Sequence, residues 1–281
     1  MTGTLEAGEE AETGELAARD RLDAIMASLK RPLVALSGGV DSALLAARAA
    51  RVGGAAATLV GSMYAAEETE RARLVAKTLG LPHHEMFVDS LAVAEIRDNP
   101  ADRCYHCRKV GMGKLVELAR AKGYGTVVDG ENADDVNDYR PGVKAMRELG
   151  LRGPLREAGL GKSWIRRWSA ELGLPTADIP AAACLASRFP HGTPLTEEAL
   201  RRVERAEAFL RRLGLRQVRV RHHGEVARIE AEADDIAGLA SQPRRDEIVR
   251  ELTRLGYRRV ALDLAGYQSG SLNPPPSANP A

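Results

Sequence analysis

Short apolar runs and amphipathic segments alternate along the N-terminal part of the chain. The runs have the length of buried strands, and the segments between them carry apolar residues at the three-to-four-residue spacing of helices. The predicted strands are 32–36, 55–63, 83–89 and 126–130, and the predicted helices are 15–30, 42–52, 66–80 and 109–123. Strands that alternate with helices form a parallel sheet with helices on both faces. The pattern therefore predicts an α/β fold.

The pattern changes in the last third of the sequence. The predicted elements there are a long amphipathic helix at 196–214, a β-hairpin at 217–231 that reverses at HHGE, a helix at 245–255 and a strand at 257–266. Together they indicate a small α+β module.

These patterns divide the chain into two predicted domains. An α/β domain covers 15–193 and a small α+β domain covers 194–269, with the boundary inside FPHGTPLT. Residues 1–14 are rich in Gly, Glu and Ala, and residues 270–281 are rich in proline, so both ends are predicted to be disordered.

Composition narrows the classes of function. The 281 residues include 40 Lys and Arg against 39 Asp and Glu, and this near-neutral balance argues against nucleic acid as a partner. No apolar run approaches the ~18 to 20 residues of a spanning helix, and the acidic N-terminus lacks the order of a signal peptide. Three cysteines suit a reducing compartment. We therefore expect a cytoplasmic protein without membrane association.

The stretch LVALSGGVDSALLA places a glycine turn between a strand and a helix. At Ser37, Gly38 and Gly39 the missing Cβ atoms let backbone N–H groups approach a ligand, and the helix N-terminus adds unpaired N–H groups and positive dipole character. Asp41 and Ser42 follow at the start of the helix, where they can bind a metal ion and a phosphate oxygen. The stretch is neither a Walker A loop, since it has no lysine at the helix start, nor a G-x-G-x-x-G loop. A bare SGG could be only a turn capped by Ser37 or Asp41.

The full string S-G-G-V-D-S resembles the PP-loop of the ATP pyrophosphatases, which cleave ATP between the α and β phosphates. The resemblance implies a Rossmann-like PP-loop fold. It also implies that the loop holds pyrophosphate together with Mg²⁺, while the adenylyl group goes to the substrate.

A second polar cluster follows the fourth predicted strand, in VVDGENADDVNDYRPG. Ligands of open α/β sheets collect at the carboxyl ends of the strands. Asp129, Asn132, Asp134 and Asp135 can supply metal ligands or ribose contacts there, and we expect Asp129 and Asn132 to contact ATP. The alternative is an Asp/Asn-rich turn without ligand.

Three cysteines carry a second kind of chemistry. Cys104 and Cys107 form a C-x-x-C pair, whereas Cys184 stands alone in ACLASRFPHG. The pair alone fits zinc, a redox pair or an iron–sulfur site, and Cys184 could simply be buried. A structural zinc would need His106 or His191 as its fourth ligand. Three thiolates would instead leave one iron of a four-iron cluster open to an exogenous sulfide.

Over about residues 16–273 the chain resembles the LarE-type sulfur transferases. The motifs are S-G-G-V-D-S, DYRPG, ACLASRFPHGT, VRVRHHGEVARIE and LDLAGYQSG. This family makes the organic part of the nickel-pincer cofactor of lactate racemase and its relatives. The resemblance implies adenylation of a carboxylate on a pyridinium dicarboxylate mononucleotide, then a thioester on protein sulfur and release of a thiocarboxylate.

The family has two forms. One has a single cysteine, matching Cys184, which gives up its own sulfur and becomes dehydroalanine. The other adds a C-x-x-C matching Cys104 and Cys107 and is associated with a [4Fe-4S] cluster. Because RCYHC is present, we expect the cluster form, with all three cysteines as ligands and sulfide or another sulfur donor as a partner. Cys184 and Asp41 are the expected catalytic residues, and family members suggest a homo-oligomer.

A substrate with phosphate and carboxylate groups calls for arginines. Arg219 and Arg221 alternate with valines and share one strand face. The resemblance places substrate phosphate here, with Arg188 near the sulfur-bearing residue and Glu230 in support. The alternative is a solvated face with charge pairs to Glu225 and Glu230.

Three other functions fit parts of the sequence. A PP-loop tRNA thiolase is disfavoured by the neutral charge and by the absence of an evident RNA-binding domain. An amidotransferase-linked ligase would need a glutaminase domain. A non-enzymatic nucleotide-binding module leaves the cysteines unexplained.

Overall fold

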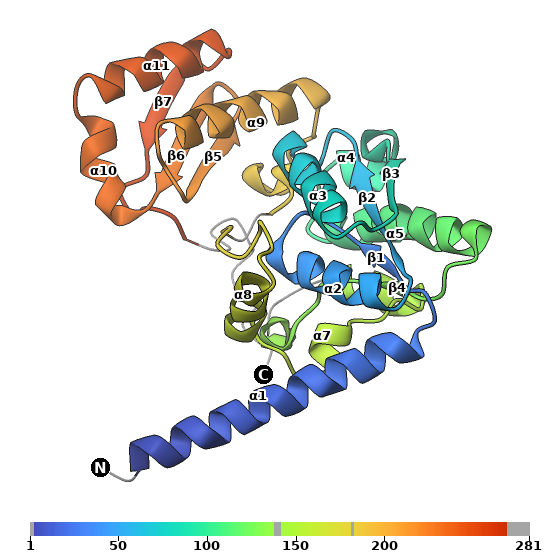
Figure 1. Ribbon diagram of the computed structural model, residues 1–281. Coiled ribbons are helices and arrows are strands. Elements are labelled where there is room, and N and C mark those ends of the chain that lie inside the picture. The colour runs from blue at the N-terminus through green and yellow to red at the C-terminus, as the bar shows by residue number, and fades with distance from the viewer. Residues whose placement is uncertain (1–2, 138–141, 181–182, 269–281) are drawn as a thin grey trace, which may run out of the picture. The chain divides into compact units, whose positions relative to one another are not determined.

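The computed structural model describes residues 3–137, 142–180 and 183–268 (Figure 1). The chain forms two compact units, one comprising Met1–Val88 with Cys104–Ala181 and the other Asp89–Arg103 with Ala182–Ala281. This division differs from the predicted boundary between residues 193 and 194, and it moves an internal segment into the second unit. The C-terminal residues predicted to be disordered lie outside the described ranges.

The first unit is built on a four-stranded parallel sheet. Its strands are β1 (Leu33–Ala35), β2 (Ala55–Val60), β3 (His83–Phe87) and β4 (Val127–Val128), in the order β3-β2-β1-β4. Val34 of β1 pairs with Ala56 of β2 and with Val128 of β4. Because parallel strands bring their carboxyl ends to one edge, the chain segments after β1 and β4 meet there. The predicted α/β class is confirmed.

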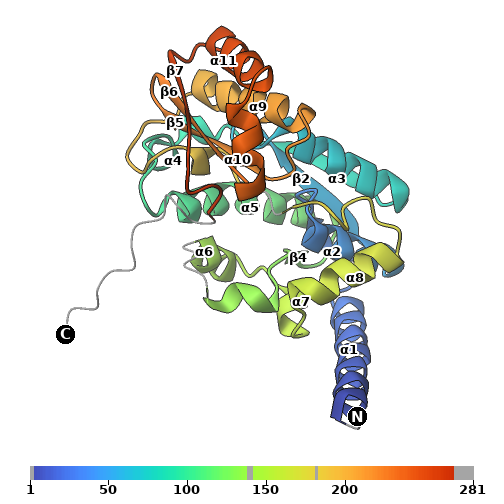
Figure 2. The same ribbon diagram turned by 90° about the vertical axis from the view of Figure 1, so that its left-hand side faces the viewer.

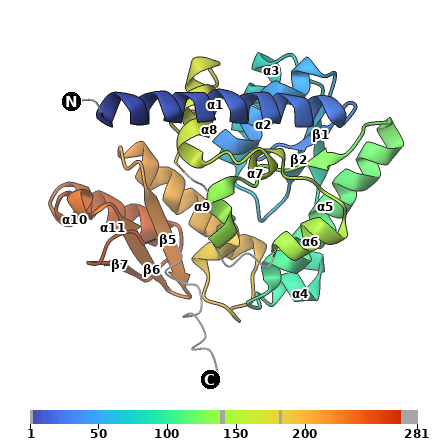
Figure 3. The same ribbon diagram turned by 90° about the horizontal axis from the view of Figure 1, so that it is seen from below.

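Helices surround this sheet. They are α1 (Gly3–Ser28), α2 (Val40–Arg51), α3 (Ala66–Thr78), α5 (Arg103–Lys122), α6 (Gly142–Glu148), α7 (Pro154–Glu157) and α8 (Lys162–Glu171), with a 3-10 turn at Ala133–Asn137. Helix α1 lies along α2 and α7 (Figure 3). Helices α6 to α8 were not predicted; the longest, α8, has only 10 residues, although its buried residues Ile165, Trp168 and Ser169 stand at helical spacing. Within the described ranges, no helix combines the length and apolar character needed to cross a membrane.

Helix α1 begins at Gly3, whereas the composition predicted disorder up to residue 14. Alanine, glutamate and leucine are strong helix formers, and no proline interrupts the stretch. Further along the helix, Leu22 and Met26 are buried. Local helix propensity and this anchored part of the helix account for the difference.

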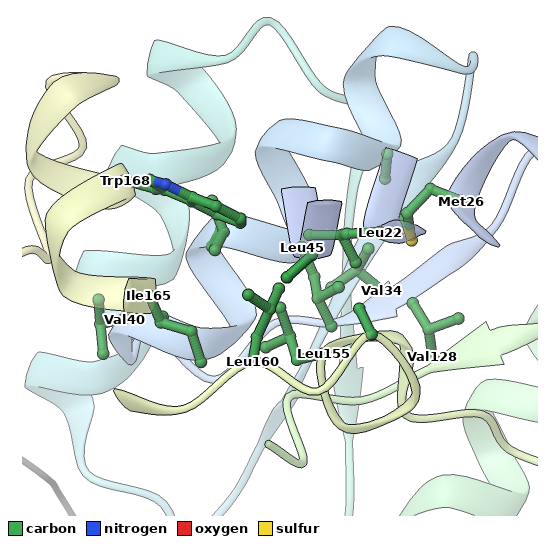
Figure 4. Packing of buried hydrophobic residues seen from close by; sticks show 14 of the residues in the cluster. Leu22, Met26, Val34, Val40, Leu45, Val128, Leu155, Leu160, Ile165 and Trp168 are labelled. Atoms are coloured by element: carbon green, nitrogen blue, oxygen red, sulfur yellow. The ribbon is translucent and has the colours of Figure 1, made fainter. Parts of the chain in front are cut away.

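Apolar side chains cover both faces of the parallel sheet. On one face, Val34 belongs to a cluster with Leu22 of α1 and Trp168 of α8 (Figure 4). On the other face, Leu33 packs in a cluster with Leu115 of α5. Successive residues of a strand point to opposite faces, so a strand covered on both sides is apolar throughout.

The second unit contains a mixed three-stranded sheet with helices against it (Figure 2). Its elements are a 3-10 turn at Ser90–Ala92, α4 (Ala94–Arg97), a 3-10 turn at Leu185–Arg188, α9 (Glu197–Arg212), β5 (Val218–His223), β6 (Val226–Ala231), α10 (Ala233–Ala240), α11 (Arg244–Arg254) and β7 (Arg259–Leu262). Strands β5 and β6 form the predicted antiparallel hairpin, and β7 pairs parallel to β6. The core joins Leu210 of α9, Val220 of β5 and Leu252 of α11.

Contacts made by side chains of Asp89–Arg103 explain why this segment belongs to the second unit. Asn99 is fully buried, with a left-handed φ of 55°, and its amide donates to the Pro190 carbonyl at 2.8 Å. The Arg103 guanidinium donates to the Ala186 carbonyl at 3.2 Å and to the Asn99 side chain. These contacts fasten the segment to the turn that follows Cys184.

Candidate active site

The glycine loop between β1 and α2 is closed by the hydroxyl group of Ser42. This hydroxyl accepts a hydrogen bond from the Ser37 N–H at 3.2 Å, donates to the Gly39 carbonyl at 3.1 Å and lies 3.1 Å from Ser37 Oγ. Gly39 is the N-cap of α2, and no side chain of the described residues caps the helix there. The loop is therefore held in shape while the helix N-terminus keeps its capacity to bind an anion.

The two glycines of the loop are needed for different physical reasons. Gly38 has a left-handed φ of 79°, and a Cβ there would lie 2.3 Å from the Glu68 carbonyl oxygen of α3. At Gly39 a Cβ would meet only Ser37 Oγ, at an ordinary 3.5 Å. Packing thus requires Gly38 but not Gly39, and the space above Gly39 is open to a ligand that approaches the backbone.

Asp41 lies in the first turn of α2, and only one of its two carboxylate oxygens is hydrogen-bonded to a described residue. Its Oδ2 accepts a hydrogen bond from Lys162 Nζ, whereas Oδ1 is buried and has no hydrogen-bond partner among the described residues. Burial raises the pKa of Asp41, and the Lys162 ammonium opposes the shift. A buried carboxylate oxygen without a partner is suited to a hard cation, so Asp41 fits Mg²⁺.

Lys162 was missed at the sequence level. It begins α8, far from the loop in sequence, and its backbone N–H donates to Asp134 Oδ2 at 2.7 Å. The lone lysine in GLGKS carries no motif that points to the loop. Only the fold brings its ammonium to Asp41.

The turn after β4 packs directly on the loop. A Cβ at Gly130 would lie 3.0 Å from Asp41 Cβ and 3.1 Å from the Ser42 nitrogen. The structure therefore brings the segment of Asp129 and Asn132 next to the glycine loop. Asn132 Oδ1 accepts from the Asp134 N–H at 3.0 Å, so its side chain also shapes the turn.

Asp129 is buried in this turn. Its Oδ2 lies 3.6 Å from Arg108 of α5. Burial raises the pKa of Asp129 to about 6, and the Arg108 guanidinium limits the shift. Between pH ~4 and ~6 the folded state keeps a proton that the unfolded chain has lost, so the free energy of unfolding falls as the pH rises through this window.

Asp129→Asn removes this buried charge. We expect the variant to raise the free energy of unfolding by about 1–3 kcal/mol at a pH above 7, and to change it little below pH ~4. Urea unfolding across this pH range measures the effect, with exposed Asp20→Asn as control. Equal pH profiles for wild type and Asp129→Asn would contradict the assignment of a raised pKa.

A small cavity of about 90 Å³ adjoins the loop within the first unit. It is lined by Ala35, Leu36, Ser37, Ala57, Thr58, Leu59, Tyr64, Glu68, Thr69, Met112 and Leu115. These residues come from β1, β2, α3, α5 and the loops after β1 and before α3, and none except Ser37 was singled out in the sequence. The cavity is mostly apolar, and it is well below the ~300 Å³ of an ordinary small-molecule site.

The C-x-x-C pair lies in the first two turns of α5. Cys104 is exposed and Cys107 half-buried, and their three-residue spacing places them on one helix face. Cys184 is half-buried in the second unit, where its carbonyl accepts from the Arg188 guanidinium at 3.1 Å. Among the described residues, no group of three or more His, Cys, Asp or Glu side chains is arranged to hold a metal ion. By chemistry alone, three thiolates suit an iron–sulfur cluster.

Buried arginine–glutamate pairs form a second candidate site, in the second unit. Arg188 donates to both oxygens of Glu207 at 2.8 Å, and Arg221 donates twice to Glu230 Oε2 at 2.9 and 2.6 Å. Of the alternative, the solvated face is wrong, because Arg219 and Arg221 are only 7% and 5% exposed, whereas the expected charge pair to Glu230 is present.

A hydrogen bond ties this site to the cysteine turn. Arg221 also donates to the Ser187 carbonyl at 2.9 Å. Glu225, the other partner considered in the solvated alternative, pairs with Arg258 instead. All four predicted substrate residues thus lie in one unit with Cys184.

Glu207 was also missed in the sequence. It lies on the buried face of α9, 1% exposed, and its Oε1 accepts from the Val220 N–H at 3.0 Å. Burial alone would raise the pKa of Glu207, but Arg188 and Arg219 hold it below its ordinary value. The helical spacing from Val203 and Leu210 places Glu207 on the apolar face of α9, and this signal in the sequence was overlooked.

Comparisons with known proteins extend over nearly the whole chain. A family model described as asparagine synthase matches residues 19–260. A pyridinium-3,5-bisthiocarboxylic acid mononucleotide synthase from Lactiplantibacillus plantarum is 38% identical over 90% of this chain and 92% of its own length. The chain belongs to this LarE-type family. An uncharacterized protein from Synechocystis sp. is 43% identical over 90% of this chain and 96% of its own length.

The LarE-type chain shares less with the tRNA thiolases. A tRNA-specific 2-thiouridylase from Azorhizobium caulinodans is 30% identical, but over 53% of this chain and 49% of its own length. The LarE-type resemblance inferred from the motifs is confirmed, and the thiolase alternative accounts for only about half of the chain.

Proposed function

We propose that this LarE-type enzyme uses ATP to adenylate a carboxylate of a pyridinium dicarboxylate mononucleotide and converts that group to a thiocarboxylate. The product is the pyridinium bisthiocarboxylate mononucleotide of the nickel-pincer cofactor of lactate racemase-like enzymes. The observation that carries the proposal is the buried Asp41 Oδ1, which has no partner in the described part of the chain, together with the open Gly39 backbone, in a chain that matches the synthase over nearly its full length.

In the first step a substrate carboxylate oxygen attacks the α-phosphorus of ATP. The bond to the bridging oxygen breaks, and pyrophosphate leaves with the electron pair. The N–H groups of the loop and the Lys162 ammonium stabilise the charge that develops on the diphosphate. Asp41 Oδ1 would hold Mg²⁺, which when bound neutralises part of that charge. Ser37, Gly38, Gly39 and Ser42 form the diphosphate cradle, with Asp129 and Asn132 toward the nucleotide.

In the second step a sulfur nucleophile attacks the acyl carbon and AMP leaves; the nucleophile is either a sulfide from a separate donor or the Cys184 thiolate. Only in the second case would loss of a proton from the Cys184 α-carbon and cleavage of its Cβ–Sγ bond then release the thiocarboxylate and leave dehydroalanine. Arg188, Arg219 and Arg221 bind the phosphate and carboxylate groups of the substrate, since charge-assisted arginine contacts suit both. Glu230 and Glu207 orient these arginines.

We further propose that Cys104, Cys107 and Cys184 hold a [4Fe-4S] cluster. Cluster iron takes thiolate ligands, and the helical spacing of Cys104 and Cys107 allows both thiolates to bind the same cluster. When bound, the cluster would offer an open iron that can carry sulfide from a separate donor, so that Cys184 is not consumed. The enzyme is proposed to work in the cytoplasm, where ATP and reduced thiols occur together. It is also proposed to form a homo-oligomer, whose mass light scattering would measure.

Anaerobic reconstitution tests the cluster. Wild-type protein is expected to bind about four irons and to absorb visible light, whereas Cys104→Ser should lose most of both. His106→Ala is the matched control, since the His106 side chain would be a ligand only in the zinc alternative and not in the cluster. Stoichiometric zinc without visible absorbance, or iron binding that survives Cys104→Ser, would rule the cluster out.

A product assay tests the function as a whole. Protein incubated with ATP, Mg²⁺ and the mononucleotide should release AMP and pyrophosphate, and mass spectrometry should find the oxygen-to-sulfur exchange in the product. Release of pyrophosphate that depends on bulk tRNA instead of the mononucleotide would favour the tRNA thiolase.

A further inference from the structure

The motif LDLAGYQSG lies at the end of the described chain, and the proposed reaction gives it no role. Residues 263–267, here called the closing turn, follow β7 and fold back on β6. The Asp263 N–H donates to the Ile229 carbonyl at 2.9 Å, and the Tyr267 N–H donates to the Ala231 carbonyl at 2.7 Å. The closing turn is thus attached to the strand that also carries Glu230.

Gly266 makes this attachment tight. Its φ of 71° is left-handed, and a Cβ there would lie 3.0 Å from the Ala231 carbonyl oxygen. Asp263 Oδ1 accepts from the Ala265 N–H at 2.9 Å and completes the turn. The backbone before Tyr267 therefore has little freedom, and the direction of the Tyr267 Cα–Cβ bond is set.

The ring of Tyr267 stacks on a predicted substrate arginine. The guanidinium carbon of Arg219 lies 5.3 Å from the ring centre, within the range of a cation–π contact. The Arg219 guanidinium also donates to the Val218 carbonyl at 2.8 Å. Burial, and after it the nearby Arg188, lower the pKa of Arg219. An aromatic face supports a crowded cation without cancelling the charge that an anionic substrate needs.

The closing turn also reaches the second arginine of the pair. Arg228 donates to Asp263 Oδ2 at 2.7 Å and to Glu230 Oε1 at 3.1 Å, and Glu230 Oε2 accepts from Arg221. Because Arg219 and Arg221 pair across the hairpin with Glu230 and Arg228, all four share one sheet face. A continuous set of contacts runs from Arg221 through the closing turn to Arg219.

We propose that Tyr267 is a positioning residue for substrate binding, which holds the Arg219 guanidinium in the orientation that receives an anionic group of the mononucleotide. This inference rests on the proposed function and adds to it a role for the closing turn. Tyr267 acts through Arg219 and takes no part in ATP chemistry.

Calorimetry of the full-length protein with the mononucleotide tests the proposal. Tyr267→Leu should weaken substrate binding about tenfold and raise the KM for the mononucleotide, with kcat and the KM for ATP nearly unchanged. Tyr267→Phe keeps the ring and should bind within about twofold of wild type. Gly266→Ala, which strains the turn but keeps Tyr267, should resemble Tyr267→Leu.

The outcomes separate the two proposals. Wild-type protein that does not bind the mononucleotide would overturn the proposed function. Wild-type binding that survives Tyr267→Leu, or a loss just as large in Tyr267→Phe, would overturn the role of the ring and leave the function intact. If Tyr267→Leu does not fold, the comparison of Tyr267→Phe with Gly266→Ala decides, because equal affinities would contradict the proposal.

Discussion

Cys184→Ala is expected to abolish thiocarboxylate formation, by at least about 10³-fold, while pyrophosphate release continues. The first step uses the carboxylate of the substrate as nucleophile and the loop around Asp41, neither of which involves the thiol. The second step has no sulfur to accept the acyl group. Pyrophosphate release and product mass, measured in the same reaction, separate the two steps.

The variant should fold normally. The turn is held by the Cys184 backbone carbonyl, which accepts from the Ser187 N–H at 2.9 Å and from Arg188, and alanine keeps both contacts. An unchanged thermal midpoint is the control. Loss of both activities together would mean that Cys184 is structural.

The mass of the wild-type protein after one turnover identifies the sulfur source. A loss of one H₂S converts Cys184 to dehydroalanine and indicates sacrifice. An unchanged mass together with product indicates a recycled sulfide, as the cluster proposal requires.

Asp41→Asn is expected to lower ATP–pyrophosphate exchange by about 10²–10³-fold. The substitution keeps shape and an oxygen for Lys162, but it removes the charge that would hold Mg²⁺. Since burial raises the pKa of Asp41, removal of the charge should not destabilise the fold. Exchange rates and calorimetric titration with ATP and Mg²⁺ provide the measurement.

Two further variants serve as a control and as an independent test of this prediction. Asp98→Asn changes a carboxylate whose side chain is 62% exposed in the second unit, and it should exchange at the wild-type rate. Lys162→Ala removes the partner of Asp41 and should also slow exchange, because a positive charge near the diphosphate is lost. Tight binding of ATP and Mg²⁺ with normal exchange in Asp41→Asn would remove Asp41 from the site.

The order of helices and strands in the first unit could be predicted because each element has its own local pattern of apolar and polar residues. The strand before Ser37 and the helix after it are apolar at the spacings that strands and helices need, and the parallel sheet follows from their alternation. The start of α1 and the short helices α6 and α7 could not be predicted in the same way. The start of α1 depends on helix propensity, and α6 and α7 have only 7 and 4 residues, too few to show a period. Helix α8 does carry its buried residues at helical spacing, a signal that was overlooked.

By itself, the sequence determined the glycine loop, the C-x-x-C pair and the family, because each is a motif of neighbouring residues whose chemistry depends on spacing along the chain. Tertiary structure decided which distant side chains complete these motifs. Lys162 beside Asp41, Glu207 beneath Arg188 and Tyr267 against Arg219 are joined only by folding. Burial is the physical reason, because it turns charges into paired groups with a fixed direction. Helical spacing can place a charge such as Glu207 on a buried face, but no local pattern records which side chain of a distant element will meet it.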